Sequence, residues 1–240
     1  MTKLHSFPDK ATSSHGDSAL AERLCNEVEG DVLFDPASRG RYSTDASHYQ
    51  IEPIGVVVPK PADDIARVIA IAAEQGLPVL PRGAGTSQCG QTVGEAIVVD
   101  VSKYLNQVLD FDADARTAWV EPGIVLDQLN AFLKPHGLWF PVDVSTSSRA
   151  TLGGMTGNNS CGARSIRYGT MRDNVRAIEA VLMNGEAMLF DEVSDNVAGA
   201  SLTPAPGGDP LWHATRSKAM AARRPYASRG RCSSMKASLG

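Results

Sequence analysis

Residues 81–92 read PRGAGTSQCGQT and place three glycines and the hydroxyl side chains of Thr86 and Ser87 in one short loop. Because glycine has no Cβ, the backbone turns tightly there, and successive N–H groups can converge on one anion. The hydroxyl groups add hydrogen-bond donors. We therefore expect this loop to hold a pyrophosphate group.

Three interpretations of the loop compete. A P-loop would match GxxxxGK[ST] at Gly85, Gly90 and Thr92, but Gln91 stands where lysine is required, and a strand is expected to follow instead of a helix. A Rossmann loop needs a third glycine where the chain has Gln88. An ordinary surface turn requires fewer glycines and fewer residues. The first two patterns fail, and the third explains too little.

The loop lies among segments that alternate between strand and helix. Ile54–Val58 is an apolar, β-branched run typical of a buried strand, and the apolar stripe of Pro61–Gln75 predicts a helix. Short strands are expected at Leu77–Leu80 and Ala96–Val101. Because a helix connects the first two strands, we expect these strands to be parallel.

The second half of the chain predicts a mixed layout. A helix is expected over Ile124–Leu133 and another is expected to open at Leu152, while strands are expected at Val108–Phe111, Thr117–Val120, Ala177–Met183 and Ala187–Phe190. The predicted fold class is α+β. We expect a leader and helix in residues 1–30, then one domain over residues 31–213, with subdomains of about 31–107 and 108–213.

Charge is distributed unevenly along the chain. Residues 214–240 hold seven Lys and Arg residues and no acidic residue, so residues 1–213 carry a formal charge of −11. An acidic body argues against nucleic acid as a partner. The basic segment holds few large apolar residues and is predicted to be disordered. It is either a tail that binds acidic surfaces or, as we favour, the product of a coding frame lost near His213.

The four cysteines are widely spaced, at positions 25, 89, 161 and 232. No CxxC pair exists, so we expect no metal or iron–sulfur site in this chain. Nothing resembles a disulfide framework, which favours a reducing compartment. The first residues lack a signal-peptide apolar region, and no apolar run is long enough to span a membrane. These features predict a cytoplasmic protein, with peripheral contact to the inner membrane left open.

A second glycine-rich segment spans residues 151–162, TLGGMTGNNSCG, and continues to Arg167-Tyr168-Gly169. Its glycines allow a flat ligand to lie against the backbone. A flexible loop without a ligand is the alternative, but Leu152, Met155 and Ile166 would be misplaced in a solvated loop. We expect free main-chain amides of both glycine segments to close around the phosphates of one dinucleotide.

Together the two segments resemble the FAD-binding domain of the vanillyl-alcohol oxidase type, also called the PCMH-type fold. The resemblance is to the branch with D-lactate and D-2-hydroxyglutarate dehydrogenases and the glycolate oxidase flavin subunit, above all to long bacterial members fused to an iron–sulfur module. It runs from about residue 31 to residue 213, and is strongest at residues 81–91, 140–143 and 151–169. It implies two α/β subdomains with the cofactor between them, in a chain that is cut short.

The resemblance implies a cofactor role for 18 residues, namely Pro81, Arg82, Gly83, Ala84, Gly85, Thr86, Ser87, Gln88, Pro141, Asp143, Thr151, Gly153, Gly154, Gly157, Asn158, Cys161, Gly162 and Ile178. The main chain of residues 82–87 should hold the pyrophosphate, and the strand around Ile178 should pass the adenine. Asp143 is equally well explained as a turn-stabilising side chain. Covalently flavinylated relatives carry a histidine in the first loop, where this chain has Gln88 and Cys89, so the FAD is expected to be non-covalent.

The implied reaction oxidises a small D-2-hydroxy acid of the lactate, 2-hydroxyglutarate or glycolate type. A base takes the hydroxyl proton while the C2 hydride moves to the flavin. In the family the base comes from a C-terminal domain, so no catalytic residue is assigned, and the electron acceptor or iron–sulfur module is supplied elsewhere. Arg164, Arg167 and Tyr168 could meet a carboxylate, although a solvated arginine is commoner. The alternatives are a non-catalytic electron-transfer subunit and an inactive fragment.

Overall fold

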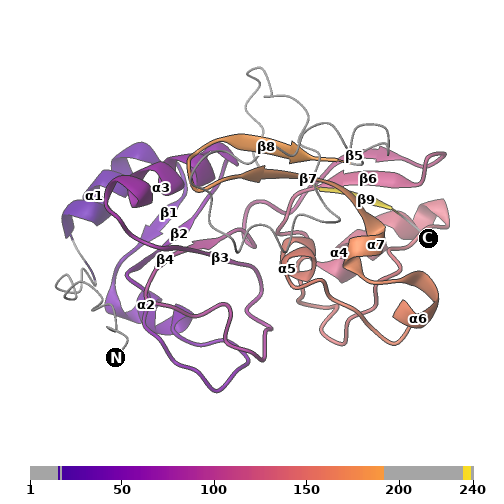
Figure 1. The fold of residues 1–240 in the computed structure, drawn as a ribbon, viewed down its shortest axis with the longest axis horizontal. Coiled ribbons are helices and arrows are strands. Elements are labelled where there is room, and N and C mark those ends of the chain that lie inside the picture. Colours follow the sequence, from indigo (N-terminus) through magenta and orange to yellow (C-terminus); the bar gives the residue numbers. More distant parts are fainter. Residues whose placement is uncertain (1–15, 17, 192–234, 239–240) are drawn as a thin grey trace, which may run out of the picture.

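The computed structural model describes residue 16, residues 18–191 and residues 235–238. The described chain forms two sheets, one of four strands and one of five. Figure 1 shows them side by side, with the β7–β8 hairpin of the second sheet reaching across toward helix α3 of the first part. The α+β fold class predicted from the sequence is confirmed.

The first sheet has the strand order β1-β2-β4-β3. β2 and β3 both run parallel to β4, as predicted, while β1 is antiparallel to β2. The strands span Asp31–Leu33 (β1), Gly55–Val58 (β2), Val79–Arg82 (β3) and Ile97–Asp100 (β4). β2 and β4 are buried along their whole length because helices cover both faces of the sheet.

Alternate residues of these strands face different helices. Val57 and Ile97 pack in one core with residues of α1 (Ser18–Glu27) and α3 (Asp63–Glu74). Val56 and Val98 face the opposite side, where Tyr42 at the end of α2 (Pro36–Tyr42) packs against them. This two-residue period is what a strand covered on both faces requires.

The predicted strand at Leu77–Leu80 begins two residues later, at Val79. Leu77 instead belongs to the end of α3, because its N–H donates to the Ala72 carbonyl at 2.8 Å across Gly76, whose φ is +65°. The shift moves Pro81 and Arg82 into β3, so the glycine loop begins at Gly83.

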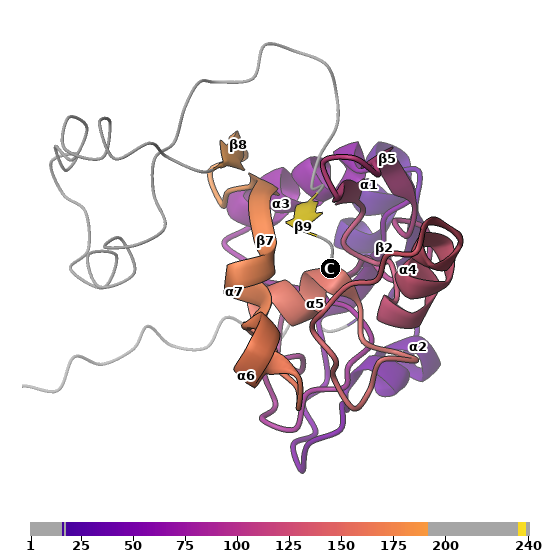
Figure 2. The ribbon, with the colours of Figure 1, turned by 90° about the vertical axis from the view of Figure 1, so that its right-hand side faces the viewer.

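The second sheet has the order β5-β6-β9-β7-β8 and is antiparallel throughout. Its strands are Val108–Asp112 (β5), Thr117–Val120 (β6), Val175–Val181 (β7), Ala187–Phe190 (β8) and Met235–Ser238 (β9). Helix α4 (Leu126–Leu133), a 3-10 turn at Lys134–His136, α5 (Leu152–Gly157), α6 (Ser165–Tyr168) and α7 (Met171–Asn174) complete this part (Figure 2). Its core includes Leu129, Leu133 and Phe140.

β9 differs from the expectation for residues 214–240. That segment was predicted to be disordered, yet Met235–Ser238 pairs with both β6 and β7 in the middle of the second sheet. The physical reason is that β6 and β7 each present a free edge at this place, and a strand bonded on both sides satisfies its backbone groups without needing a strong apolar pattern. Residues 214–234, 239 and 240 lie outside the described residues.

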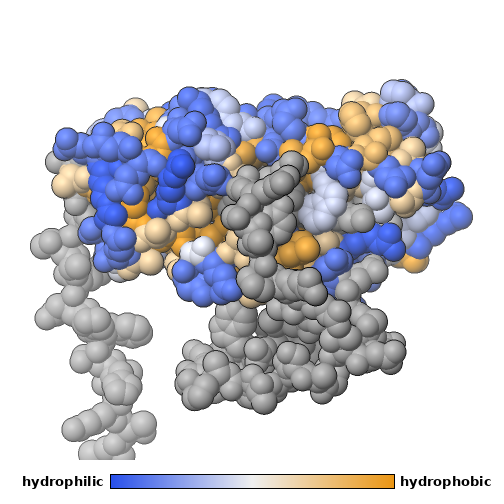
Figure 3. All heavy atoms as spheres, turned by 90° about the horizontal axis from the view of Figure 1, so that it is seen from above, coloured by the Kyte–Doolittle hydropathy of each residue, from blue (hydrophilic) through white to orange (hydrophobic). Residues whose placement is uncertain are grey.

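The face above the β7–β8 hairpin is mixed in character. Figure 3 shows hydrophilic and hydrophobic residues interspersed over this face. No described helix is long and apolar enough to cross a membrane.

Candidate functional site

The first glycine loop presents unused main-chain donors. Within the described chain, none of the five N–H groups from Gly83 to Ser87 donates to a protein acceptor. Gly85 holds a φ of +65°, a conformation that side chains disfavour, so the loop reverses direction there. The loop follows β3 at the carboxyl edge of the parallel strands, where α/β proteins place ligands. These free donors suit an anion.

The side chain of Arg82 fixes this loop from behind. Its guanidinium donates to the carbonyl oxygens of Tyr42 at 3.2 Å, Thr92 at 3.1 Å and Thr44 at 2.9 Å. It also lies over the Tyr42 ring, 5.2 Å from its centre. Three carbonyls therefore occupy the guanidinium, and Arg82 acts as an anchor that holds both ends of the loop, while the loop amides stay free.

Tyr42 is itself fixed beneath Arg82. Its hydroxyl donates to the Asp100 carboxylate at 2.7 Å. Burial, followed by this hydrogen bond, raises the pKa of Tyr42 well above that of a free tyrosine, so the phenol stays protonated and keeps donating. The floor under the loop is therefore a fixed hydrogen-bonded network.

The second glycine segment uses its amides internally, which corrects the expectation of two sets of free amides. The Leu152 N–H donates to the Ile124 carbonyl at 2.9 Å, the Gly153 N–H to the Pro122 carbonyl at 2.8 Å, and the Gly154 N–H to Thr151 Oγ1 at 3.3 Å. The first turn of α5 therefore has no donor left for a phosphate. This segment instead contributes a wall that lacks a side chain at Gly157, where a Cβ would meet nothing within 4 Å.

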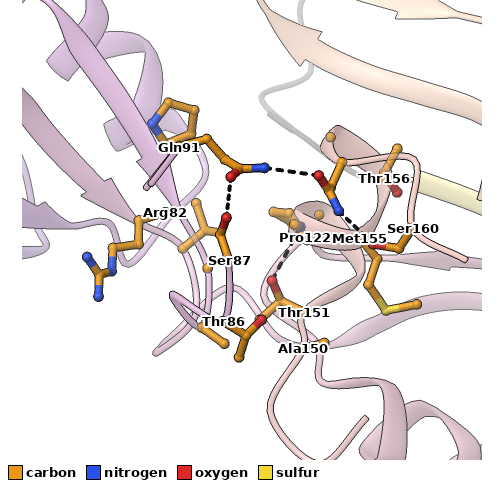
Figure 4. A pocket seen from close by; sticks show the side chains of 18 of the residues that line it. Arg82, Thr86, Ser87, Gln91, Pro122, Ala150, Thr151, Met155, Thr156 and Ser160 are labelled. Carbon is orange, nitrogen blue, oxygen red and sulfur yellow. Dashed lines mark hydrogen bonds between the residues drawn. The ribbon is translucent and has the colours of Figure 1, made fainter. Parts of the chain in front are cut away.

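The two glycine segments line one cavity of about 960 Å³. They touch at its base, where a Cβ on Gly83 would lie 2.2 Å from Thr151 Oγ1. Figure 4 shows Thr86 and Ser87 on one side of the cavity and Thr151, Met155 and Ser160 on the other. Ligand pockets typically measure about 300–1,000 Å³, so this one can hold a large ligand.

Fourteen of the 18 residues expected at the cofactor line this cavity. They are Pro81, Arg82, Gly83, Ala84, Gly85, Thr86, Ser87, Thr151, Gly153, Gly154, Gly157, Asn158, Cys161 and Ile178. The other four, Gln88, Pro141, Asp143 and Gly162, are not among the lining residues.

Asp143 has the structural role that its alternative interpretation gave it. Its carboxylate accepts from the Arg164 N–H at 3.0 Å and lies 3.6 Å from the Arg164 guanidinium. Gly162 packs so tightly against this residue that a Cβ there would lie 1.6 Å from the Asp143 carbonyl oxygen. These residues hold the turn after α5 in place from outside the cavity.

The arginines after α5 also lie outside the cavity lining. The Arg164 guanidinium is 5.0 Å from the Trp139 ring centre, and that of Arg167 is 5.3 Å from the Tyr168 ring centre. Trp139 and Tyr168 meet edge to face at 5.2 Å. Nothing in this arrangement directs either cation into the cavity.

Residues 53–190 match the sequence model of a family described as "FAD binding domain". The match covers more than half of the 240 residues. The chain belongs to this family of FAD-binding domains.

Relatives agree with the branch expected from the sequence. A D-2-hydroxyglutarate dehydrogenase of Haemophilus influenzae is 41% identical over 70% of this chain and 17% of its own length. The glycolate oxidase subunit GlcD of Bacillus subtilis is 39% identical over 74% of the chain and 39% of its own length. This FAD-binding domain therefore spans well under half of these relatives.

Solved structures show the same fold. An alkyldihydroxyacetonephosphate synthase matches with a TM-score of 0.70 at 18% identity, over 99% of this chain and 42% of that protein. The Physcomitrella patens protein BBE-like 1 matches with a TM-score of 0.68 at 18% identity, over 92% of this chain and 44% of that protein. At this identity the likeness concerns the fold alone.

The cavity of this FAD-binding domain includes residues that sequence reasoning missed. Ile65 and Ile69 on α3, Val79 on β3 and Met183 after β7 form apolar lining. The helical period of α3 places the two isoleucines on one face of the helix. It does not show whether that face contacts a ligand or another part of the protein. Gln91 was considered only as a failed P-loop lysine, yet it also lines the cavity.

Among the described residues, no group of three or more His, Cys, Asp or Glu side chains could hold a metal ion. The described cysteines, Cys25, Cys89 and Cys161, are free.

Proposed function

We propose that this chain binds FAD in the cavity between its two sheets, with the pyrophosphate on the main-chain amides of residues 83–87. The observation that carries the proposal is the set of five N–H groups without a protein acceptor, in a described loop that lines a cavity of about 960 Å³. Convergent amides in a turn are a common anion site. Because Arg82 is committed to three carbonyls, neutral donors rather than a cation would hold the phosphates.

The two ends of the cavity suit different parts of a dinucleotide. Ile65, Ile69 and Ile178 offer apolar contacts for one flat ring, which we assign to the adenine. The α5 end offers the Ser160 hydroxyl, which can hydrogen-bond a polar edge of the other ring system. The Thr156 hydroxyl also lines this end, and because it donates to the Leu152 carbonyl at 2.7 Å it is left to act as an acceptor. Gly157 leaves that wall open to close approach.

We infer that the FAD is non-covalent. As far as the described residues go, the cavity lining contains no histidine or tyrosine, and Cys161 is the one cysteine in it. Gln88 and Cys89, which stand in the region where flavinylated relatives carry histidine, are not among the lining residues. Flavin that stays in the acid-precipitated protein pellet would overturn this inference and direct attention to Cys161.

Within the whole protein, we propose that the domain serves the oxidation of a D-2-hydroxy acid of the 2-hydroxyglutarate, lactate or glycolate type. The flavin, when bound, would accept a hydride. This chain's residues would position the cofactor, while the base and the carboxylate clamp would come from outside the described chain, since Arg164 and Arg167 do not line the cavity. The electron acceptor, or an iron–sulfur module, would also be supplied elsewhere.

The purified chain tests both levels of the proposal. A flavin absorbance band at roughly 450 nm after gel filtration supports cofactor binding, and a folded chain that retains no added FAD refutes it. Bleaching of the bound flavin by D-2-hydroxyglutarate, D-lactate or glycolate under anaerobic conditions would show that the chain alone oxidises a substrate. Bound flavin that none of them bleaches indicates a flavin-binding or electron-transfer portion that needs further chain.

We propose a cytoplasmic location, with contact to the inner membrane limited to its surface. The free state of the described cysteines supports a reducing compartment. Cell fractionation followed by a salt wash separates a soluble protein from a peripheral one, and retention in the membrane after the wash would contradict both.

A further inference from the structure

Two amide side chains bridge the mouth of the cavity between the glycine segments. Gln91 Nε2, from the first loop, donates to Asn158 Oδ1, at the end of α5, at 3.0 Å. The two residues are 67 positions apart in the chain. In Figure 4 the upper dashed line from Gln91 marks this bond, which crosses from one wall to the other.

Each amide is held by a neighbour on its own side. The Ser87 hydroxyl donates to Gln91 Oε1, and Asn158 Nδ2 donates to Ser160 Oγ at 3.5 Å. All four residues line the cavity. The result is a chain of hydrogen bonds, Ser87–Gln91–Asn158–Ser160, that spans the opening with its central bond between the two walls.

The bridge lies at the solvent-exposed edge of the site. Gln91 and Asn158 are both exposed, whereas the base of the cavity is closed by contact between Gly83 and buried Thr151. A ligand seated on the amides of residues 83–87 would thus lie between a fixed contact below and a breakable polar bond above. Such a bond can open and close without moving either subdomain core.

We propose that Gln91 and Asn158 form a clasp that retains the cofactor by holding the two glycine segments together across it. The clasp rests on the proposed FAD site and adds a role for two side chains. It acts mainly on release: the bond must break before the walls separate, so its loss accelerates dissociation. Because a neutral hydrogen bond contributes about 1 kcal/mol net, removing it should speed FAD release about fivefold.

The test compares FAD release from the full chain and from Gln91→Ala, Asn158→Ala and the double variant. The flavin-loaded protein is diluted, and the release rate is followed by the fluorescence of free flavin. Gln107→Ala is the matched control, because Gln107 and Asn106 form another exposed amide pair, at 2.6 Å, away from the cavity. Unfolding midpoints of all variants without cofactor verify that they fold alike.

A clasp predicts that each single variant releases FAD about fivefold faster and that the double variant is no faster than either, since both remove one bond. Gln107→Ala should match the unaltered chain. Single variants with the release rate of the unaltered chain overturn the clasp. So do effects that multiply in the double variant, because then each amide holds the cofactor separately. A chain that never retains FAD refutes the proposed function, and the clasp with it.

Discussion

The contact between Gly83 and Thr151 joins the two glycine segments, and one methyl group can test it. A Cβ on Gly83 would lie 2.2 Å from Thr151 Oγ1 and 3.3 Å from the Thr151 Cβ. Thr151 is buried, and its Oγ1 accepts the N-cap bond from the Gly154 N–H at 3.3 Å. In Gly83→Ala, therefore, either Thr151 rotates and loses this cap, or the two walls separate.

The expected loss in the free energy of unfolding follows from these two structural responses. Loss of a threonine N-cap costs about 1 kcal/mol, and overpacking by a methyl group costs about 1–3 kcal/mol. We expect Gly83→Ala to lower the free energy of unfolding by about 2 kcal/mol. Thr151→Ala removes the cap and the obstacle together, at about 1 kcal/mol, so Gly83→Ala added to it should cost little more. The double variant should then lose about 1 kcal/mol rather than about 3 kcal/mol.

Urea unfolding followed by tryptophan fluorescence measures these differences. Gly157→Ala is the control, because its Cβ would meet nothing within 4 Å, and it should not destabilise the fold. If the double variant loses the full sum of the single variants to within about 0.5 kcal/mol, the two residues are uncoupled and the proposed contact is wrong.

Two further perturbations probe the scaffold of the site. Asp64 is fully buried, and its carboxylate accepts from the N–H groups of Glu29, Gly30 and Lys60 at 2.9–3.2 Å. Asp64→Asn should therefore lower the free energy of unfolding, measured in urea, by about 3 kcal/mol. The exposed control Asp63→Asn should change it by less than about 0.5 kcal/mol, and equal losses in the two variants would contradict this account. The pKa of Tyr42 is raised in the folded chain, so the stabilisation it gives is complete below about pH 10, the pKa of a free tyrosine, and declines at higher pH. Tyr42→Phe should therefore flatten the fall in stability above about pH 10, and an unchanged pH profile would refute the role given to the phenol.

Strong apolar runs made the first sheet predictable. β2 and β4 are buried on both faces, so nearly every residue in them is apolar, and their positions were predicted to within one residue. The start of β3 was misplaced because Leu77 satisfies the apolar pattern of a strand while its N–H closes the end of α3. A side-chain pattern alone does not distinguish these two uses of a leucine.

β9 shows a different limit of sequence reasoning. Met235–Ser238 has no β-branched residue and spans only four positions, and its partners β6 and β7 lie far from it along the chain. What places it in the sheet is the pairing capacity of two existing edges, which is a property of the assembled fold. The strand propensity of these four residues does not predict this pairing.

The two glycine segments look alike in sequence but differ in what their amides do, and the surroundings explain why. Gly83 follows a parallel strand at the open edge of a sheet, where no described residue accepts from the loop amides. Gly153 packs against Pro122, whose carbonyl takes its N–H, and a Cβ there would lie 2.9 Å from that oxygen. A glycine thus allows either a free amide or a close contact within the protein, and only the neighbours decide between them. We therefore assign the proposed anion site to the first segment, and the second contributes the facing wall.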